Sequence, residues 1–345
     1  SNGIKSVVDA RSASVMIQSR SSEGRVYAER IRAPVTRASS RLEYTSRQTA
    51  AARGASKDGR MGVGEVVYNR VLRRLAPKAG GADKRSVRSL AWLVAGMTLE
   101  HDVRLERIAL AMSGSPTLAG RVRRLRRCLD GAINVQAIYQ RLIADDARWW
   151  YVGRVFVVLD TTSVGGRLYF VRLALCHASR ALPLAWRAYE RRSATIGFGD
   201  YRPLLEAADR LLPRRLERVL VADRGFQHIR LARWALEHGW RLRLRVKGSL
   251  GITFPDGTGG RISERRRRLG AVRCFDPVAI GVQRVGPFGL TLTWPRYGKD
   301  RALHVLSDDP PTERTLWEFE RREAVEAAFR DDKGAGFQLE RSRIR

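Results

Sequence analysis

The sequence predicts an α/β protein in which a mixed β-sheet with flanking helices follows a smaller helical region. The hydrophobic pattern supports this prediction, because its period changes from helical to strand-like near residue 150. Residues 151–345 then alternate between short apolar runs and amphipathic segments, an order typical of α/β folds. With 345 residues, 44% of them hydrophobic, the chain can form an extensive core and two or three structural parts.

The charge of the chain indicates a polyanionic partner. Lys and Arg total 65 against 35 Asp and Glu, a formal net charge of +30 that excludes a typical neutral metabolic enzyme. No apolar run reaches membrane-spanning length, so we expect a soluble, cytoplasmic protein that is not associated with a membrane. Cys128, Cys176 and Cys274 form no CxxC pair, which argues against a zinc site or a disulfide framework.

Residues 1–60 lack a regular hydrophobic pattern. They are rich in Ser, Arg and Ala and poor in large aliphatic residues, so we expect them to be disordered. Met61 begins a regular helical pattern and could be the natural start, in which case residues 1–60 are a non-native leader. The sequence leaves both interpretations open.

Residues 61–150 are expected to form short amphipathic helices with arginines on their polar faces. The densest cluster is the stretch RVRRLRRCLD, residues 121–130, where Arg123, Arg124 and Arg127 are candidate contacts to DNA phosphates. An ordinary solvated helix face is the alternative. The high positive charge elsewhere in the chain favours a helical DNA-binding region.

Residues 151–345 are expected to form an RNase H-like domain. Three strands, then a helix, a strand, a helix and a strand follow one another in the order of that fold. The expected strands are 154–164, 167–177, 181–190, 218–226 and 240–248, and the expected helices are 201–213 and 227–239. Residues 250–307 are β-like and rich in turns, which predicts a β-rich insertion before a final helix.

Two carboxylates end otherwise apolar strands. Asp160 stands at the end of the apolar run of the first expected strand and Asp223 at the end of that of the fourth, and in a mixed sheet of this topology these positions can be neighbours. Two buried carboxylates side by side repel each other, and a bound divalent cation removes that conflict. Each aspartate taken alone could equally be a strand-end cap.

The final expected helix carries charges on one face. Phe319, Arg322, Glu326 and Lys333 occur in the stretch FERREAVEAAFRDDK, and the four-residue spacing places Arg322 and Glu326 together. A solvated ion pair is the common explanation for such charges. The two aspartates upstream favour a functional site with Glu326 as the third acid.

These residues resemble the DDE transposases of bacterial insertion sequences. The stretches VVLDTTSV, VLVADRGF and FERREAVEAAFRDDK look like the branch that carries Tyr, Arg, Glu and Lys around its third acid. Arg322, Glu326 and Lys333 match that spacing, whereas Phe319 stands where the tyrosine is usual. The resemblance covers the chain from Met61 to its end.

The resemblance implies a metal-dependent transposase, an endonuclease and strand transferase of DNA recombination. Asp160, Asp223 and Glu326 would be the catalytic acids and would bind two Mg²⁺ ions, for which Mn²⁺ can substitute. Arg322, Lys333 and the residue at Phe319 would contact DNA, and Trp294 could stack on an unpaired base, with a half-buried strand tryptophan as the alternative. The implied partners are the terminal inverted repeats and target DNA, bound by a homodimer, with a hairpin intermediate.

Two other functions fit part of the sequence. Relatives usually continue past residue 340 into a further apolar helix, so the chain could be a truncated, catalytically inactive remnant that still binds transposon ends. A structure-directed nuclease on the same fold explains the acids but not the spacing of Arg322, Glu326 and Lys333.

Overall fold

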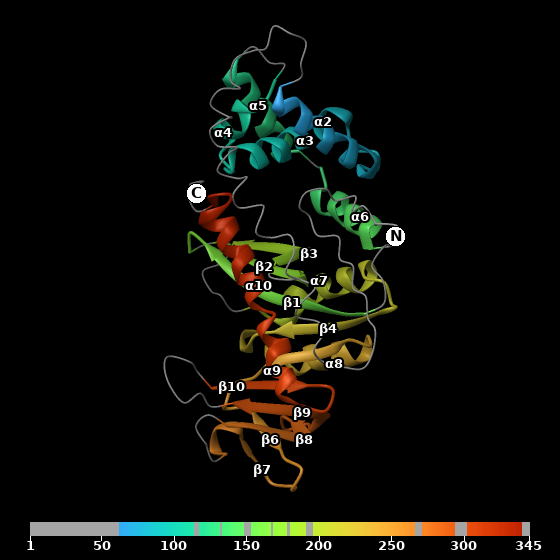
Figure 1. Cartoon of the computed structure of the whole chain (residues 1–345), viewed down its shortest axis with the longest axis vertical. Helices are drawn as coiled ribbons and strands as arrows, with labels where there is room; N and C mark the ends of the chain where they lie inside the picture. Colours follow the sequence, from blue (N-terminus) through green and yellow to red (C-terminus); the bar gives the residue numbers. More distant parts are fainter. Residues whose placement is uncertain are drawn as a thin grey trace, which may run out of the picture. The chain divides into compact units, whose positions relative to one another are not determined.

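The computed structural model describes most of the chain beyond residue 61 (Figure 1). The described ranges are 62–113, 117–131, 133–147, 153–166, 168–177, 180–190, 196–265, 271–293 and 302–339. Two compact units are present: a helical unit of residues 62–142 with 330–339, and a sheet unit of residues 143–329. The expectations for residues 1–60 and for Trp294 lie outside the described residues.

The helical unit contains the helices that the sequence predicts. They are α2 (Val63–Leu75), α3 (Lys84–Glu100), α4 (Leu105–Leu110) and α5 (Leu118–Leu129), with the short η1 (Ala76–Lys78) after α2 and α6 (Val135–Ala147) leading into the sheet unit. Trp92 stacks on Tyr68 with ring centroids 4.1 Å apart, and Ile108 and Leu125 are buried beside them. None of the helices in the described ranges is long and apolar enough to cross a membrane.

The sheet unit has the element order that the sequence predicts. The described strands form one ten-stranded sheet in the order β3-β2-β1-β4-β5-β10-β9-β8-β6-β7. Its first half comprises β1 (Gly153–Val164), β2 (Leu168–His177), β3 (Arg180–Glu190), β4 (Leu216–Ala222) and β5 (Arg241–Arg245). The strands β1, β2 and β3 pair antiparallel, whereas β1, β4 and β5 pair parallel. The predicted α/β class with a mixed sheet is therefore confirmed.

The β-rich segment after β5 extends the same sheet. It comprises β6 (Gly251–Thr253), β7 (Gly259–Arg261), β8 (Val272–Ile280), β9 (Val285–Thr293) and β10 (Leu303–Ser307). Because β10 pairs antiparallel with β5 on one side and with β9 on the other, the strands of this segment are continuous with the first half of the sheet. The sequence pattern shows that a segment is extended, but it does not show which strand will be its neighbour.

The helices cover both faces of the sheet. Figure 1 shows α9 (Glu313–Glu320) and α10 (Glu323–Arg330) running across the strands. Phe319, Val325 and Phe329 of these helices form one apolar cluster with Val158 and Val219 of the sheet. Residues that alternate with Val158 in β1 point to the opposite face and are also buried. Two further helices, α7 (Phe198–Leu211) and α8 (Ile229–Glu237), contact β2, β3 and β5.

The predicted final helix is broken into three parts. A turn at Arg321 and Arg322 separates α9 from α10, and α10 continues into a π-helical turn at Asp331–Ala335. The expectation of one regular helix over residues 319–338 is therefore wrong. The apolar residues on both sides of the turn are buried in the same cluster, and this tertiary packing compensates for the loss of a regular helix.

A buried charge network joins α9 to the sheet. Glu318 is 1% exposed, and its carboxylate pairs at 2.6 Å with Arg154 of β1 and at 2.6 Å with Arg243 of β5. Arg243 also donates to Asp309 at 2.9 Å, and Arg154 pairs with Glu217 at 2.8 Å. The partner set satisfies charges that would be costly to bury alone.

Candidate active site

The sheet topology brings Asp160 and Asp223 together. Leu159 of β1 and Ala222 of β4 are paired in the parallel register, and the two aspartates are the next residues along these strands. Asp223 directly follows β4, as the sequence predicts, whereas β1 continues beyond Asp160 to Val164. Asp160 shares the face of Val158, the face that α9 and α10 cover. The predicted juxtaposition of the two acids is therefore present.

Arg322 links Asp160 to Glu326. Its Nη1 donates to Asp160 Oδ2 at 3.0 Å, and its Nη2 pairs with Glu326 Oε1 at 2.6 Å. The ion pair to Glu326 spans one helical turn, as the four-residue spacing predicts. The side chain of Asp160 is 11% exposed, that of Arg322 20% and that of Glu326 45%, so the site opens toward solvent on the side of Glu326.

Burial raises the pKa of Asp160 above its ordinary value. The Arg322 guanidinium and the backbone N–H of Thr161, which donates to Asp160 Oδ1 at 2.8 Å, oppose this shift, while the negative charge of Asp223 adds to it. Both oxygens of Asp160 thus accept a hydrogen bond, one from Thr161 and one from Arg322.

Burial lowers the pKa of Arg322, but the charges of Asp160, Glu326 and Asp223 outweigh it and raise that pKa above the ordinary value. The guanidinium pairs directly with Asp160 and Glu326, and the negative charge of Asp223 adds to their effect. It therefore stays charged, and its protonation state is not a variable of the site.

Two further arginines near the acids were not anticipated from the sequence. Arg245, the last residue of β5, pairs with Asp223 at 3.3 Å. Arg172 of β2 is the cross-strand partner of Asp160 and places its guanidinium 4.7 Å from the centroid of the Phe329 ring. For Arg172 the available signal was a cation inside the otherwise apolar run of β2, because such a residue is rarely buried without a partner.

The acids have the donor chemistry of a site for a hard divalent cation. Mg²⁺ takes oxygen ligands, and Asp160, Asp223 and Glu326 supply only carboxylate oxygens. Among the described residues no group of three or more His, Cys, Asp or Glu side chains is arranged to hold a metal ion. The side chain of Arg322 lies between Asp160 and Glu326 and pairs with both.

Phe319 does not contact the acids or the surface around them. The residue is 4% exposed and packs in the apolar cluster with Val158 and Val325. The prediction that Phe319 faces a DNA phosphate is therefore wrong. The turn after α9 changes the direction of the chain between Phe319 and Glu326, so their helical spacing does not place them on one face.

Lys333 lies beyond the last α-helical residue of α10. It falls in the π-helical turn Asp331–Ala335, in the part of the chain that belongs to the helical unit. A π turn contains more residues than an α turn and therefore rotates less per residue, so the predicted alignment of Lys333 with Glu326 by α-helical spacing does not apply. A contact between Lys333 and DNA stays a prediction.

The arginines of α5 differ in their surroundings. Arg123 and Arg127 are exposed, whereas Arg124 is partly buried and donates through Nε to Ser89 Oγ of α3 at 3.1 Å. Arg121 donates to the carbonyl oxygen of Met112 at 2.7 Å. Arg123 and Arg127 therefore stay candidates for DNA contact, and Arg124 has a structural contact as well.

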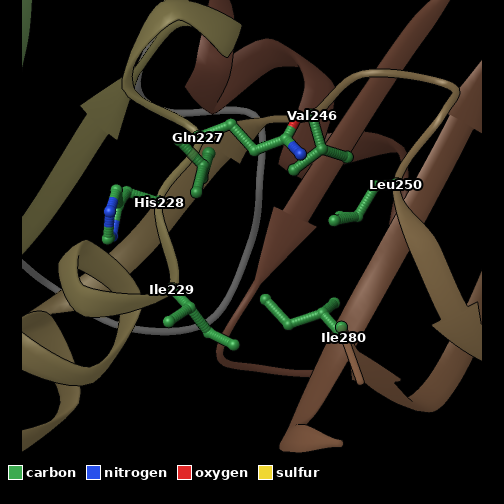
Figure 2. A pocket seen from close by; sticks show the side chains of 8 residues that line it. Gln227, His228, Ile229, Val246, Leu250 and Ile280 are labelled. Atoms are coloured by element: carbon green, nitrogen blue, oxygen red, sulfur yellow. The ribbon is translucent and has the colours of Figure 1, made fainter. Parts of the chain in front are cut away.

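A small cavity next to β5 contains none of the acids (Figure 2). Its lining is mostly aliphatic, with Ile229, Val246 and Ile280 around it. The polar side chains at its edge are already engaged: Gln227 Oε1 accepts from the backbone N–H of Lys247 at 2.6 Å, and His228 Nδ1 accepts from that of Arg230 at 3.1 Å. The cavity therefore offers little to fix the orientation of a polar ligand.

Comparison with known proteins gives only a distant structural likeness. No family model matches the sequence, and no curated protein matches it. One solved structure that matches is a piggyBac transposase synaptic complex with hairpin DNA, determined by cryo-EM, with a TM-score of 0.42 and 12% sequence identity. The match covers 78% of this chain and 66% of that chain, so this chain spans just under two thirds of that protein's length. This likeness assigns no role to any residue of the site.

Proposed function

We propose that this protein is a DNA transposase of the DDE type, which cleaves the ends of an insertion sequence and joins them to target DNA. One observation carries the proposal. Asp160 and Asp223 follow paired residues of adjacent parallel strands, and Glu326 joins Asp160 through a single shared guanidinium. The strand order β3-β2-β1-β4-β5, with its antiparallel meander and parallel pairs, supports an RNase H-like catalytic domain.

Each residue of the site has a proposed role. Asp160, Asp223 and Glu326 hold the divalent cations, and Arg322 and Lys333 bind phosphates of the transposon end, since guanidinium and ammonium groups suit phosphate oxygens. The exposed Arg123 and Arg127 of the helical unit contact the DNA backbone and supply affinity that does not depend on sequence. Two copies of the chain hold two ends, so a dimer on DNA is part of the proposal.

The chemistry is an in-line displacement at phosphorus. Asp160, Asp223 and Glu326 would hold two Mg²⁺ or Mn²⁺ ions, whose charge would serve to activate the attacking oxygen and to stabilise the leaving oxygen. The chain itself holds the acids in place: Asp160 and Asp223 are fixed by the sheet, and Glu326 by α10, whose Val325 and Phe329 are buried against it. Such a site is rigid on the sheet side and open to DNA on the side of Glu326.

A DNA-binding remnant without cleavage activity is the second candidate. It is favoured by one observation: within the described residues the acids are neutralised by Arg322 and Arg245 and form no group arranged for a metal ion. Both candidates bind DNA, but they differ in what Mg²⁺ does.

A nicking assay separates the two candidates. The full chain is incubated with Mg²⁺ and labelled duplexes that cover the ends of the DNA element encoding it. We expect nicking by the parent protein and none by Asp160→Asn, Asp223→Asn or Glu326→Gln, each of which retains DNA binding because it removes only a charge that holds metal. Binding without nicking by the parent supports the remnant, and nicking by any one variant near the parent rate excludes that acid.

A further inference from the structure

We propose that Arg322 is an internal cation that holds the place of a divalent ion at the acids until a DNA phosphate draws it away, so that DNA and the ion bind cooperatively. This inference rests on the proposed function, since it concerns the same three acids. It assigns Arg322 two positions, one on the carboxylates and one on a phosphate.

The first position is the one in the structure. The two terminal nitrogens of Arg322 are divided between two acids, with Nη1 at 3.0 Å from Asp160 Oδ2 and Nη2 at 2.6 Å from Glu326 Oε1. The other oxygen of Asp160 accepts from the backbone N–H of Thr161 at 2.8 Å. Both oxygens of Asp160 thus already accept a hydrogen bond, so an incoming ion competes with the guanidinium of Arg322 at Oδ2.

Arg322 and a divalent ion compete for the carboxylate oxygens of both Asp160 and Glu326. A divalent ion bound by Asp160 and Glu326 lies within a few ångströms of the position that the guanidinium now takes, and like charges at that distance repel strongly in a partly buried site. The repulsion lowers the affinity for the ion as long as Arg322 stays. Removal of Arg322 from the acids instead leaves adjacent carboxylates without that counter-charge, which favours the ion.

Arg322 is placed so that it can leave. It lies in the turn between α9 and α10, its side chain is 20% exposed, and its partner Glu326 is 45% exposed. Phe319 and Val325, on either side of Arg322 in the sequence, are buried in the apolar cluster and fix the backbone there. Only the side chain of Arg322 therefore has to move. A phosphate accepts both terminal nitrogens at once, which matches the fork that the two carboxylates now occupy.

The coupling is reciprocal by thermodynamic necessity. If DNA removes Arg322 from the acids and thereby raises the affinity for the ion, the ion must raise the affinity for DNA by the same factor. Such coupling suits a nuclease, because the ion stays weakly bound until a DNA phosphate reaches the site.

The test measures ion binding directly. Mn²⁺ is titrated into the full chain without DNA, and the free ion is followed by electron paramagnetic resonance. Arg322→Gln is expected to bind Mn²⁺ at least about tenfold more tightly than the parent, the size of a typical coupling between sites. The matched control is Arg202→Gln, because Arg202 forms the same i,i+4 pair with Glu206 at 2.7 Å on α7. The control should leave Mn²⁺ affinity unchanged. Equal or weaker Mn²⁺ binding by Arg322→Gln overturns the inference.

A second variant and a second readout complete the test. Arg322→Lys keeps the charge but loses the fork, so it should bind Mn²⁺ more tightly than the parent and less tightly than Arg322→Gln. If Arg322→Gln does not fold, as judged by circular dichroism, the comparison uses Arg322→Lys instead. A Mn²⁺ affinity of Arg322→Lys equal to that of the parent then overturns the inference. In the parent, Mn²⁺ at constant ionic strength should also tighten binding of a fluorescent duplex, and Arg322→Gln should reduce this gain.

The outcome is separable from that of the nicking assay. A parent protein that nicks DNA, paired with an Arg322→Gln variant that gains no Mn²⁺ affinity, retains the proposed function and loses this inference. A parent that never nicks, paired with a clear gain of Mn²⁺ affinity in Arg322→Gln, retains the coupling in a protein that binds without cutting.

Discussion

Replacing the buried carboxylate of Glu318 should destabilise the sheet unit more than any change of a surface charge on the same helix. Glu318 is 1% exposed, and it pairs with Arg243, itself 2% exposed, at 2.6 Å. The substitution Glu318→Gln keeps the shape of the side chain and removes its charge. The guanidinium of Arg243 then stays buried with one negative partner fewer. A buried charge without its partner is the main free-energy cost of breaking a buried ion pair.

The size of the effect follows from the remaining partners. Removing one partner of a buried pair costs about 3–5 kcal/mol, and we expect the lower end because Asp309 still accepts from Arg243 at 2.9 Å. For a unit of this size, a loss of about 3 kcal/mol lowers the Tm by roughly 6–12 °C. Differential scanning calorimetry of the full chain measures the shift, with Glu320→Gln, an exposed position of α9, as the control.

A double substitution sharpens the same prediction. If the pair acts as a unit, Glu318→Met combined with Arg243→Met should cost less than the sum of the single changes, because neither charge is then left buried alone. A Tm for Glu318→Gln as high as that of the Glu320→Gln control would refute the view that this network holds α9 to the sheet.

Three further outcomes are expected from other parts of the chain. Phe319→Tyr should lower stability by about 1–3 kcal/mol in thermal melts, since a hydroxyl added to the apolar cluster has no partner, and a more stable variant would place the ring at the surface. Arg123→Gln combined with Arg127→Gln should reduce the slope of log DNA affinity against log salt by about 2, and an unchanged slope would mean that this face of α5 does not meet phosphates. Iodoacetamide at pH 8 should modify the exposed Cys274 first, because burial raises the pKa of the Cys176 thiol to about 12, and mass spectrometry of the folded chain shows the order.

The sequence was sufficient to predict the first half of the sheet. The apolar runs around Asp160 and Asp223 are long enough to identify buried strands, and the parallel pairing of β1 with β4 then follows from the order of elements. The i,i+4 contact between Arg322 and Glu326 is a local property of a helix and was predicted for the same reason. These predictions depend only on periodicity and on the chain order of the elements.

The features of the fold and the site that were not predicted depend on tertiary contacts, which no local sequence pattern encodes. Residues 319–338 carry an apolar stripe of helical period, which predicts one continuous helix, but the chain turns between α9 and α10 while Phe319 and Phe329 pack into the same cluster. In the same way, Arg245 could not be assigned to Asp223 because the pairing arises from the neighbourhood of β4 and β5. Side-chain partners of this kind become visible only when the strand order is known.

The turn between α9 and α10 separates the buried ion pairs of Glu318 from the partly exposed ion pairs of Arg322. Before the turn, Glu318 is buried and held by Arg154 and Arg243, so its ion pairs fix the helix and cannot be exchanged without a large cost. Arg322 in the turn and Glu326 after it are partly exposed, so their ion pairs are weaker and can be exchanged for contacts with solutes. A continuous helix would have carried both sets through the same environment. Because of this turn, Glu318, whose ion pairs fix α9, and Arg322, whose ion pairs can be exchanged, lie only four residues apart.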